Sequence, residues 1–315
     1  MTAAGLDDLA SMARIRAFEE RVRALAIDKK VIGSVHLCIG QEAIPVGACA
    51  ALRSEDAVFA TYRGHGWALA RGVPPAAVFG ELLGRAGGVN GGRGGSAYFS
   101  SARHGFFGEN SIVAGSAPIA VGAALAARFD GSGRVALAAF GDGAMNQGAM
   151  HEAMNFASVF SLPVVFICEN NGYSELTPIA DMVADAELWH RAAAYGMPGR
   201  RVDGNDVAAV RAAVAVAVDR CRSGHGPSLI EAMTERLVGH YIGDAEQYRP
   251  AGEVDRARER EPIAAALAAL AAAGVSPQEC ADVEAWAIQQ IAAAEVEALA
   301  MEPADAAAVE MHLYA

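Results

Sequence analysis

Apolar residues recur along this chain with two spacings, and each spacing predicts a different kind of element. Short apolar runs bounded by Gly, Pro or Asn lie at 135–140, 164–168 and 227–232, which is typical of buried strands. Helical spacing separates the first two runs, so this stretch predicts a parallel βαβ unit. The alternation of strands and helices indicates an α/β fold, a doubly wound parallel sheet with flanking helices.

Helical patterns extend beyond this core at both ends. Residues 7–30 repeat apolar side chains every three or four positions, and residues 262–298 form an alanine-rich helical tail. We therefore expect a single domain over residues 1–315. Its predicted parts are an N-terminal helical part at 1–55, an α/β core at 56–236, a polar loop at 237–255 and a C-terminal helical tail at 256–315.

Charge and hydropathy exclude several classes of partner. With 37 acidic and 25 basic residues the net charge is −12, which argues against a nucleic-acid partner. No segment approaches the roughly 20 uninterrupted apolar residues of a membrane span, and the N-terminus lacks the apolar core of a secretory signal. The five cysteines lack metal-ligand spacing, so we expect buried free thiols in a cytoplasmic protein. A hydrophobic content of 53% favours an extensive subunit interface.

Polar side chains follow the two strands of the βαβ unit. Asp142 leaves the first strand within Gly141-Asp142-Gly143, and Asn171 leaves the second 29 positions later (171 − 142). Because parallel strands end at one edge of a sheet, we expect these side chains to lie close together. A carboxylate and an amide oxygen suit a magnesium ion that keeps its other positions for water and phosphate. Gly143 lets the backbone approach a ligand, and the following helix start offers N–H groups to an anion.

A lone Gly-Asp-Gly is also an ordinary turn. Here Asn170-Asn171 follows it, and together they resemble the magnesium-diphosphate motif of thiamine diphosphate enzymes. Further segments, in the same order, resemble the alpha subunits of thiamine-dependent 2-oxo acid dehydrogenases, from about Ala13 to Ala315. These segments are HLCIGQEA at 36–43, YRGHG at 62–66, GGVNGGRGGS at 87–96, NSIVAGSAP at 110–118 and GHYIGD at 239–244.

The resemblance implies roles for several residues at a thiamine diphosphate and Mg²⁺ site. Side chains from three segments would contact the diphosphate, Val113 would support the bent cofactor, and three histidines would handle protons. The predicted catalytic residues are His240, His65 and His36. The predicted cofactor-binding residues are Tyr62, Arg63, Ser111, Val113, Asp142, Gly143, Ala144, Asn171, Arg236 and His240. The predicted metal ligands are Asp142, Asn171 and the carbonyl of Tyr173.

The chain departs from the family pattern near the aminopyrimidine contact. Ser111 stands where a glycine is common, and Ala114-Gly115 replaces Gly-Ala. Residues 84–100 hold seven glycines, which suits a flexible linker by composition. The resemblance instead makes this segment an ordered wall of the active-site entrance.

Residues 239–255 are polar and rich in glycine, so they are predicted to form a loop. The resemblance makes residues 237–255 an active-site loop, a lid that closes over the cofactor and carries His240. Its apolar anchors are few, chiefly Tyr241, Ile242 and Tyr248, so we expect it to be mobile without a ligand. Tyr241 and Gly243 stand where mitochondrial pyruvate enzymes have phosphorylatable serines, and the segment is closer to bacterial acetoin dehydrogenase alpha subunits.

The family also needs a glutamate at the pyrimidine N1′, which its beta subunit supplies. Glu42 and Glu109 could serve in this chain, but we interpret both as structural. The resemblance therefore implies half of an active site, completed by a beta subunit in an α2β2 heterotetramer.

Three functions remain open at this stage. The favoured one is the alpha subunit of a 2-oxo acid or acetoin dehydrogenase, which cleaves a C–C bond next to a carbonyl and passes the acyl unit to a lipoyl acyltransferase. The alternatives are a thiamine diphosphate-dependent acyloin synthase (carboligase) and a non-catalytic magnesium-binding scaffold. The sequence leaves the substrate open among pyruvate, branched 2-oxo acids, acetoin and a specialised metabolite precursor.

Overall fold

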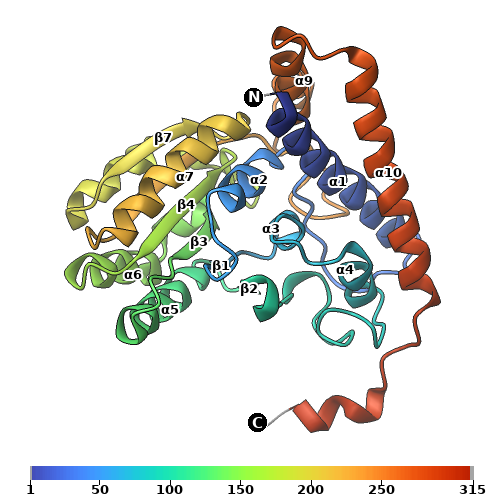
Figure 1. Ribbon diagram of the computed structural model, residues 1–315, viewed down its shortest axis with the longest axis horizontal. Coiled ribbons are helices and arrows are strands. Elements are labelled where there is room, and N and C mark those ends of the chain that lie inside the picture. Colours follow the sequence, from blue (N-terminus) through green and yellow to red (C-terminus); the bar gives the residue numbers. More distant parts are fainter. Residues whose placement is uncertain (1, 313–315) are drawn as a thin grey trace.

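A six-stranded parallel sheet forms the centre of the computed structural model, which describes residues 2–312 (Figure 1). The strand order is β2-β1-β3-β4-β8-β7, and every neighbouring pair is parallel. The strands are β1 (Ala57–Phe59), β2 (Phe106–Gly108), β3 (Ala136–Gly141), β4 (Val164–Asn170), β7 (Gly199–Asp203) and β8 (Ser228–Met233). Helices flank the sheet, so the predicted α/β class is confirmed. Residues 313–315 of the predicted tail lie outside the described residues.

Both faces of the sheet are buried, which explains why its central strands are continuous apolar runs. Along β3, Leu137 and Ala139 enter one hydrophobic core, whereas Ala138 and Phe140 enter the other. The helices with residues in the first core include α2 (Ala43–Ala50) and α7 (Val207–Arg222), and those in the second are α5 (Ser116–Asp130) and α6 (Gly148–Val159). The alternation of side chains along one strand therefore builds both layers.

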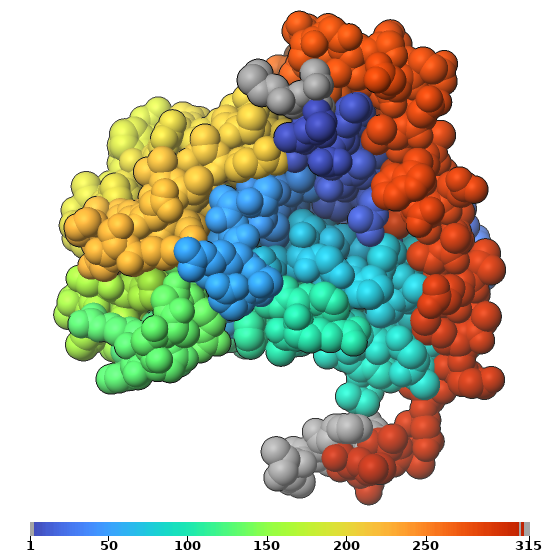
Figure 2. Space-filling model, viewed as in Figure 1, coloured from blue at the N-terminus to red at the C-terminus, as the bar shows by residue number. Residues whose placement is uncertain are grey.

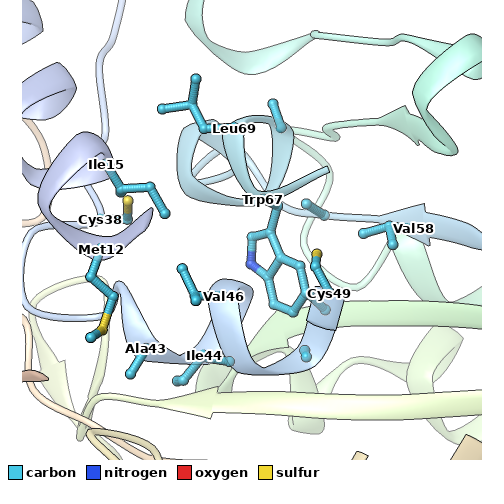
Figure 3. Close-up of a cluster of buried hydrophobic side chains, with 14 of the residues drawn as sticks. Met12, Ile15, Cys38, Ala43, Ile44, Val46, Cys49, Val58, Trp67 and Leu69 are labelled. Carbon is cyan, nitrogen blue, oxygen red and sulfur yellow. The ribbon is translucent and has the colours of Figure 1, made fainter. Parts of the chain in front are cut away.

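The N-terminal helices pack as a layer around Trp67. Helix α1 (Thr2–Ile27) confirms the helix expected at 7–30 but ends earlier, where Lys29 takes a left-handed backbone. Trp67 is 1% exposed and lies beside Cys49 of α2, with side chains of α1 nearby (Figure 3). Trp67 belongs to a short helix that begins at His65, within the YRGHG segment. This layer therefore fixes one side of the predicted site.

The C-terminal tail is two long helices, α9 (Pro262–Ala272) and α10 (Pro277–Ala300), not one. Gly274 has a positive φ of 85°, and Ser276 caps α10 through a capping box with Glu279, so the chain stops and restarts there. Helix α10 packs along α1 and forms a ridge on one side of the molecule (Figure 2).

Several shorter elements complete the fold. Residues 188–195 form a 3₁₀ helix, and the active-site loop gives way to helix at residue 253, before its expected end at 255. The remaining elements are α3 (His65–Ala70), α4 (Pro75–Leu82), α8 (Glu253–Arg258), β5 (Tyr173–Ser174), β6 (Thr177–Pro178), and the 3₁₀ helices η1 (Gly95–Ala97), η2 (Ala102–His104), η3 (Asp142–Asn146), η4 (Ile179–Asp181), η5 (Leu188–Tyr195) and η6 (Ala306–His312).

Two further expectations can be compared with the described residues. All five cysteines are buried and free, as predicted. Among residues 2–312, no helix is both long enough and apolar enough to cross a membrane.

Packing between α2 and α7 predicts a sharp difference between two glycines. A Cβ on Gly47 would lie 2.6 Å from the carbonyl oxygen of Val207, and that backbone cannot move cheaply, so Gly47→Ala should destabilise the protein by roughly 1–3 kcal/mol. A Cβ on the helical Gly122 would meet nothing within 4 Å, so Gly122→Ala should stabilise by about 0.5–1 kcal/mol. Urea unfolding of the purified chain measures both, and equal effects would contradict the packing.

Candidate active site

A cavity of about 140 Å³ lies at the carboxyl ends of the central strands. Segments that follow β1, β3 and β4 line it together, as expected for parallel strands that end at one edge. The predicted site residues that line the cavity are Tyr62, Arg63, Val113, Asp142, Gly143, Ala144, Asn171, Tyr173, Arg236 and His240.

Three predicted residues do not line this cavity. Ser111 is partly buried beside it, next to Ile112 and Val113, which do line it. His36 packs behind the wall, with its ring 4.3 Å from that of Tyr62 and 4.9 Å from that of His240. Burial and the Arg63 charge lower the pKa of His36 to about 3, so its ring is neutral at physiological pH.

His65 is also set back from the cavity, and it is fully buried. Its Nδ1 lies 2.9 Å from a carboxylate oxygen of Glu19, and its Nε2 lies 2.9 Å from Oγ of Ser96. Burial opposes a charge on this ring, but the Glu19 carboxylate outweighs it and raises the pKa of His65. With both ring nitrogens engaged, His65 holds neighbouring segments in place, and the structure does not bring it to the cavity as a catalytic group.

Asp142 presents an unsatisfied oxygen at the cavity. Its Oδ1 accepts a hydrogen bond from the Gly143 N–H at 3.0 Å, while Oδ2 is buried without a partner among the described residues. Burial raises the pKa of Asp142 to about 6. A Cβ on Gly143 would collide with Ser174, so this glycine makes room for the loop that carries Tyr173.

The two asparagines of the Asn170-Asn171 pair have different roles. Asn170 is buried and joins β4 to β8, because its Nδ2 donates to Glu231 at 2.6 Å. Asn171 lies at the cavity, where its Oδ1 accepts from the Tyr173 N–H at 3.2 Å and its Nδ2 donates to Gln41. The first asparagine therefore fixes the strand end and the second faces the site.

His240 is held in one tautomer by Arg236. The Arg236 Nη1 lies 3.1 Å from the His240 Nδ1, and a guanidinium can only donate, so the ring proton is on Nε2. Burial and the charges of Arg63 and Arg236 lower the pKa of His240 to about 4, which keeps the ring neutral. His240 can therefore act as an N–H donor at physiological pH.

The two cavity arginines differ in what remains available for a ligand. Arg63 donates to the carbonyl of Leu37 at 2.5 Å and to the carbonyl of His240 at 3.0 Å, so it ties the loop to the core. Arg236 keeps its Nε buried without a partner among the described residues, and burial beside Arg63 lowers its pKa to about 10. Arg236 and Asp142 thus line one small cavity, and each has a buried polar atom without a partner in residues 2–312.

The active-site loop has polar anchors that its composition concealed. Oδ2 of Asp244 accepts from the His240 N–H at 2.6 Å and from the Tyr248 hydroxyl at 2.8 Å. Arg249 donates to the carbonyls of Arg236 at 2.8 Å and Val238 at 2.9 Å. The expectation concerned apolar anchors only and did not include these hydrogen bonds, in which side chains hold backbone groups. Its mobility in solution stays a prediction.

The backbone near the predicted aminopyrimidine contact is strained. Ala114 has a φ of 68°, a left-handed conformation that glycine adopts more readily. A Cβ on Gly115 would lie 2.8 Å from Nδ2 of Asn110, so the close packing favours a glycine at position 115. The alanine at position 114, by contrast, has a strained backbone. Ile112 is 73% exposed and Val113 is 45% exposed at this rim. The cavity therefore has an apolar, open side.

Sequence reasoning missed some residues that line the cavity, among them Gln41, Asn110 and Glu169. Each is adjacent to a recognised motif: Gln41 within HLCIGQEA, Asn110 before Ser111, and Glu169 before Asn170-Asn171. Glu42 and Glu109 do not line it; Glu42 accepts from the Nε of Arg16 at 2.5 Å.

These features test whether a metal-diphosphate group fits. Among the described residues no three His, Cys, Asp or Glu side chains form a metal cluster, so a transition-metal centre of that kind is not indicated. One unpaired carboxylate oxygen, a neighbouring amide and a spare guanidinium N–H instead suit Mg²⁺ with a phosphate ligand. The donor set therefore fits the predicted group.

Comparison with known proteins gives a consistent family. The family model described as dehydrogenase E1 component matches residues 10–308. The alpha subunit of acetoin:2,6-dichlorophenolindophenol oxidoreductase from Bacillus subtilis is 44% identical over 253 residues, covering 80% of this chain and 76% of the relative. The alpha subunit of the pyruvate dehydrogenase E1 component from Zymomonas mobilis is 42% identical over 282 residues, covering 89% of this chain and 80% of the relative.

The fold and the matches together define a thiamine diphosphate-dependent oxidoreductase subunit. The chain belongs to the dehydrogenase E1 component family, among relatives that are alpha subunits of pyruvate and acetoin enzymes. An alpha subunit of this family has a beta subunit as its partner. The predicted residue roles remain predictions.

The unpaired Asp142 oxygen should make the free protein sensitive to pH. Its pKa is raised from 3.8 to about 6, so the group favours the folded state only while protonated, and stability is lost as pH rises through 6. Asp142→Asn removes this pH-dependent loss. The variant should therefore gain about 1 kcal/mol relative to wild type between about pH 5 and pH 7. Urea unfolding without cofactor or metal measures this, and a constant difference would contradict an unpaired carboxylate.

Proposed function

We propose that this chain is the alpha subunit of a 2-oxo acid or acetoin dehydrogenase that holds thiamine diphosphate and Mg²⁺ at the cavity and requires a beta subunit for turnover. One observation carries the proposal: Asp142 and Arg236 both line the cavity at the sheet edge, and each has a buried polar atom without a partner among the described residues. Such groups are costly unless a ligand pairs with them. A magnesium-diphosphate group would satisfy both.

The residues that would hold the metal are Asp142, Asn171 and the carbonyl of Tyr173. Asp142 would supply the charge, while Asn171 and Tyr173 are already linked by a 3.2 Å hydrogen bond. Arg236 would use its free Nε for a phosphate oxygen. The bound thiamine diphosphate would supply the electron sink that stabilises the carbanion formed when a bond next to a carbonyl breaks.

Proton handling would fall to His240. Its neutral ring carries the proton on Nε2, and Arg236 holds its orientation through Nδ1. Such a group can donate to a developing alkoxide without first gaining a proton. The His36 ring lies against the rings of both His240 and Tyr62, so we propose that His36 holds those two side chains in position.

We propose that the beta subunit covers the open, apolar side of the cavity. Ile112 and Val113 expose apolar surface at the rim, and neither Glu42 nor Glu109 reaches the cavity to act on the pyrimidine. Burial raises the pKa of Glu109 to about 8, which fits a neutral structural carboxyl. We therefore assign the N1′ glutamate to the beta subunit in an α2β2 heterotetramer. Five buried free thiols support placing this assembly in the cytoplasm.

The acceptor is proposed to be the lipoyl group of an acyltransferase core. Relatives named for acetoin and for pyruvate both lie near 43% identity, so identity alone does not select the substrate. The bacterial acetoin dehydrogenase alpha subunits that this segment resembles usually have a glutamate where this chain has Ile242. This departure does not select the substrate either, because Ile242 lines a separate pocket and not the cavity. An acyloin synthase would share the same site.

The decisive experiment assays the copurified alpha and beta subunits. Pyruvate, branched 2-oxo acids and acetoin are each tested with a dye acceptor, with lipoylated acyltransferase domain and with an aldehyde acceptor. Dye reduction and lipoyl acylation together support the dehydrogenase, whereas carbon–carbon ligation without lipoyl transfer supports the synthase. Failure of the pair to bind thiamine diphosphate would favour the scaffold. The alpha chain alone should be inactive, so robust turnover by it would contradict the proposed partner.

Two substitutions should separate binding from chemistry. Asp142→Ala removes the charged metal ligand and should weaken thiamine diphosphate binding by about 100-fold or more. His240→Ala leaves that ligand in place, so it should lower turnover by roughly 100-fold or more while cofactor affinity changes only a few-fold. Calorimetric cofactor titration and steady-state kinetics of the alpha–beta pair give the two readouts.

Two substitutions serve as matched controls. Asp219→Ala and His151→Ala change residues of the same types that do not line the cavity, and Asp219 is exposed on α7. Normal affinity in Asp142→Ala would defeat the metal assignment. Normal turnover in His240→Ala would leave His240 without a catalytic role.

A further inference from the structure

The glycine-rich segment at 84–100 is ordered around one buried carboxylate. Oε2 of Glu81 accepts hydrogen bonds from the N–H groups of Asn90 at 2.7 Å and Gly92 at 2.8 Å, and Oε1 accepts from Gly94 at 2.6 Å. Glu81 itself is 1% exposed. Converging backbone N–H groups form a concave anion site, here filled by a side chain of the same protein.

Nothing local favours a glutamate at this position. Glu81 lies in the last turn of α4, where the helix dipole disfavours a negative charge. None of the ion pairs among residues 2–312 includes it, and a buried carboxylate is costly when it is unpaired. The three amides of the glycine-rich segment are therefore what compensates its charge.

Glycine is required where the segment wraps closely around Glu81. A Cβ on Gly88 would lie 2.7 Å from both the backbone nitrogen and Oε2 of Glu81. Gly92 has a φ of 75°, and a Cβ there would lie 2.6 Å from the carbonyl carbon of Gly84. The glycine content therefore reflects close packing and not a linker.

Two other contacts hold the segment from outside. The Asn90 side chain accepts from the Ser100 N–H at 2.9 Å and donates to its carbonyl at 3.2 Å, which closes the segment into a loop. The chain after α10 runs beside the segment (Figure 1), where Ala86 donates to the carbonyl of Glu302 at 2.9 Å. A variant of Glu81 should therefore loosen this segment without unfolding the protein.

The ordered segment ends on the residues that support the active site. Ser96 is 4% exposed, and its Oγ lies 2.9 Å from Nε2 of His65. His65 follows Arg63 by two positions, and Arg63 lines the cavity. The other ring nitrogen of His65 is held by Glu19, so Ser96 completes the support of this loop.

We infer that Glu81 is a positioning residue of the active site. Its carboxylate binds three N–H groups of the glycine-rich segment and so holds Ser96 against His65. This contact positions the loop that carries Tyr62 and Arg63. This inference rests on the proposed function only for its effect on turnover. The order of the two segments follows from hydrogen bonds within this chain.

The test is a double-mutant cycle in the copurified alpha–beta pair. Glu81→Gln keeps the shape but turns an NH₂ group toward the amides. Ser96→Ala keeps the three hydrogen bonds to Glu81 and removes only the hydrogen bond to His65. Glu297→Gln is the matched control, because Glu297 also lies near the end of a helix but is exposed. Amide exchange by mass spectrometry follows residues 60–68, 86–100 and, as reference, β8.

Glu81→Gln should speed exchange at 86–100 by roughly tenfold and at 60–68 by a few-fold, with β8 unchanged. Ser96→Ala should speed exchange at 60–68 alone. The double variant should match the larger single effect at 60–68 and in kcat/KM, because both changes act through one contact. The control should change neither segment.

Three results would overturn the inference. One is a Glu81→Gln variant whose glycine-rich segment loosens while residues 60–68 and kcat/KM stay at wild-type values. The second is additive effects in the double variant, and the third is loosening that extends equally to β8. Either of the last two would make Glu81 a general stabilising residue. A wild-type pair without dehydrogenase activity would instead defeat the proposed function, and the exchange cycle would still decide the role of Glu81.

Discussion

The parallel register between β3 and β4 is the constraint on which the site depends. Gly141 pairs with Glu169, so the two strands end together and release Asp142 and Asn171 at one edge. A slip of one residue would turn every side chain of a strand to the opposite face, and both faces are buried here. The apolar residues that fill the two cores therefore also fix the separation of the polar residues at the strand ends.

The site concentrates electrostatic cost in a small volume. Asp142 has a raised pKa, and Arg236 and His240 have lowered pKa values. Within residues 2–312, one buried atom of Asp142 and one of Arg236 have no hydrogen-bond partner. Groups of this kind cluster where a ligand is to be bound, because the ligand then pairs with what the fold leaves unpaired. The surrounding chain compensates with tight backbone anchoring. Arg63, Asp244 and Arg249 all use their side chains to hold main-chain groups of the active-site loop.

The same device recurs farther from the cavity. Glu81 holds three amides of the glycine-rich segment, and Glu19 holds both the His65 ring and the Cys38 N–H. The glycine-rich segment has few apolar side chains of its own, so a charged side chain orders it through the backbone. Since glycine offers only its main chain for contact, this form of anchoring suits glycine-rich loops near a ligand.

The sequence by itself determined the α/β class, the strand ends that carry Asp142 and Asn171, and most of the cavity lining. Local periodicity and motif spacing indicate these features, and both can be read directly from the sequence. It did not reveal that Asn170 is structural, that His65 is engaged on both sides, or that Asp244 and Arg249 anchor the loop. The first two outcomes depend on Glu231 and Glu19, 61 and 46 residues away. The bonds of Asp244 and Arg249 are more local, but which backbone group each side chain reaches depends on how the loop folds. Hydrogen bonds over such separations have no signature in local spacing, so only the tertiary structure decided which polar residues face the ligand and which hold the chain.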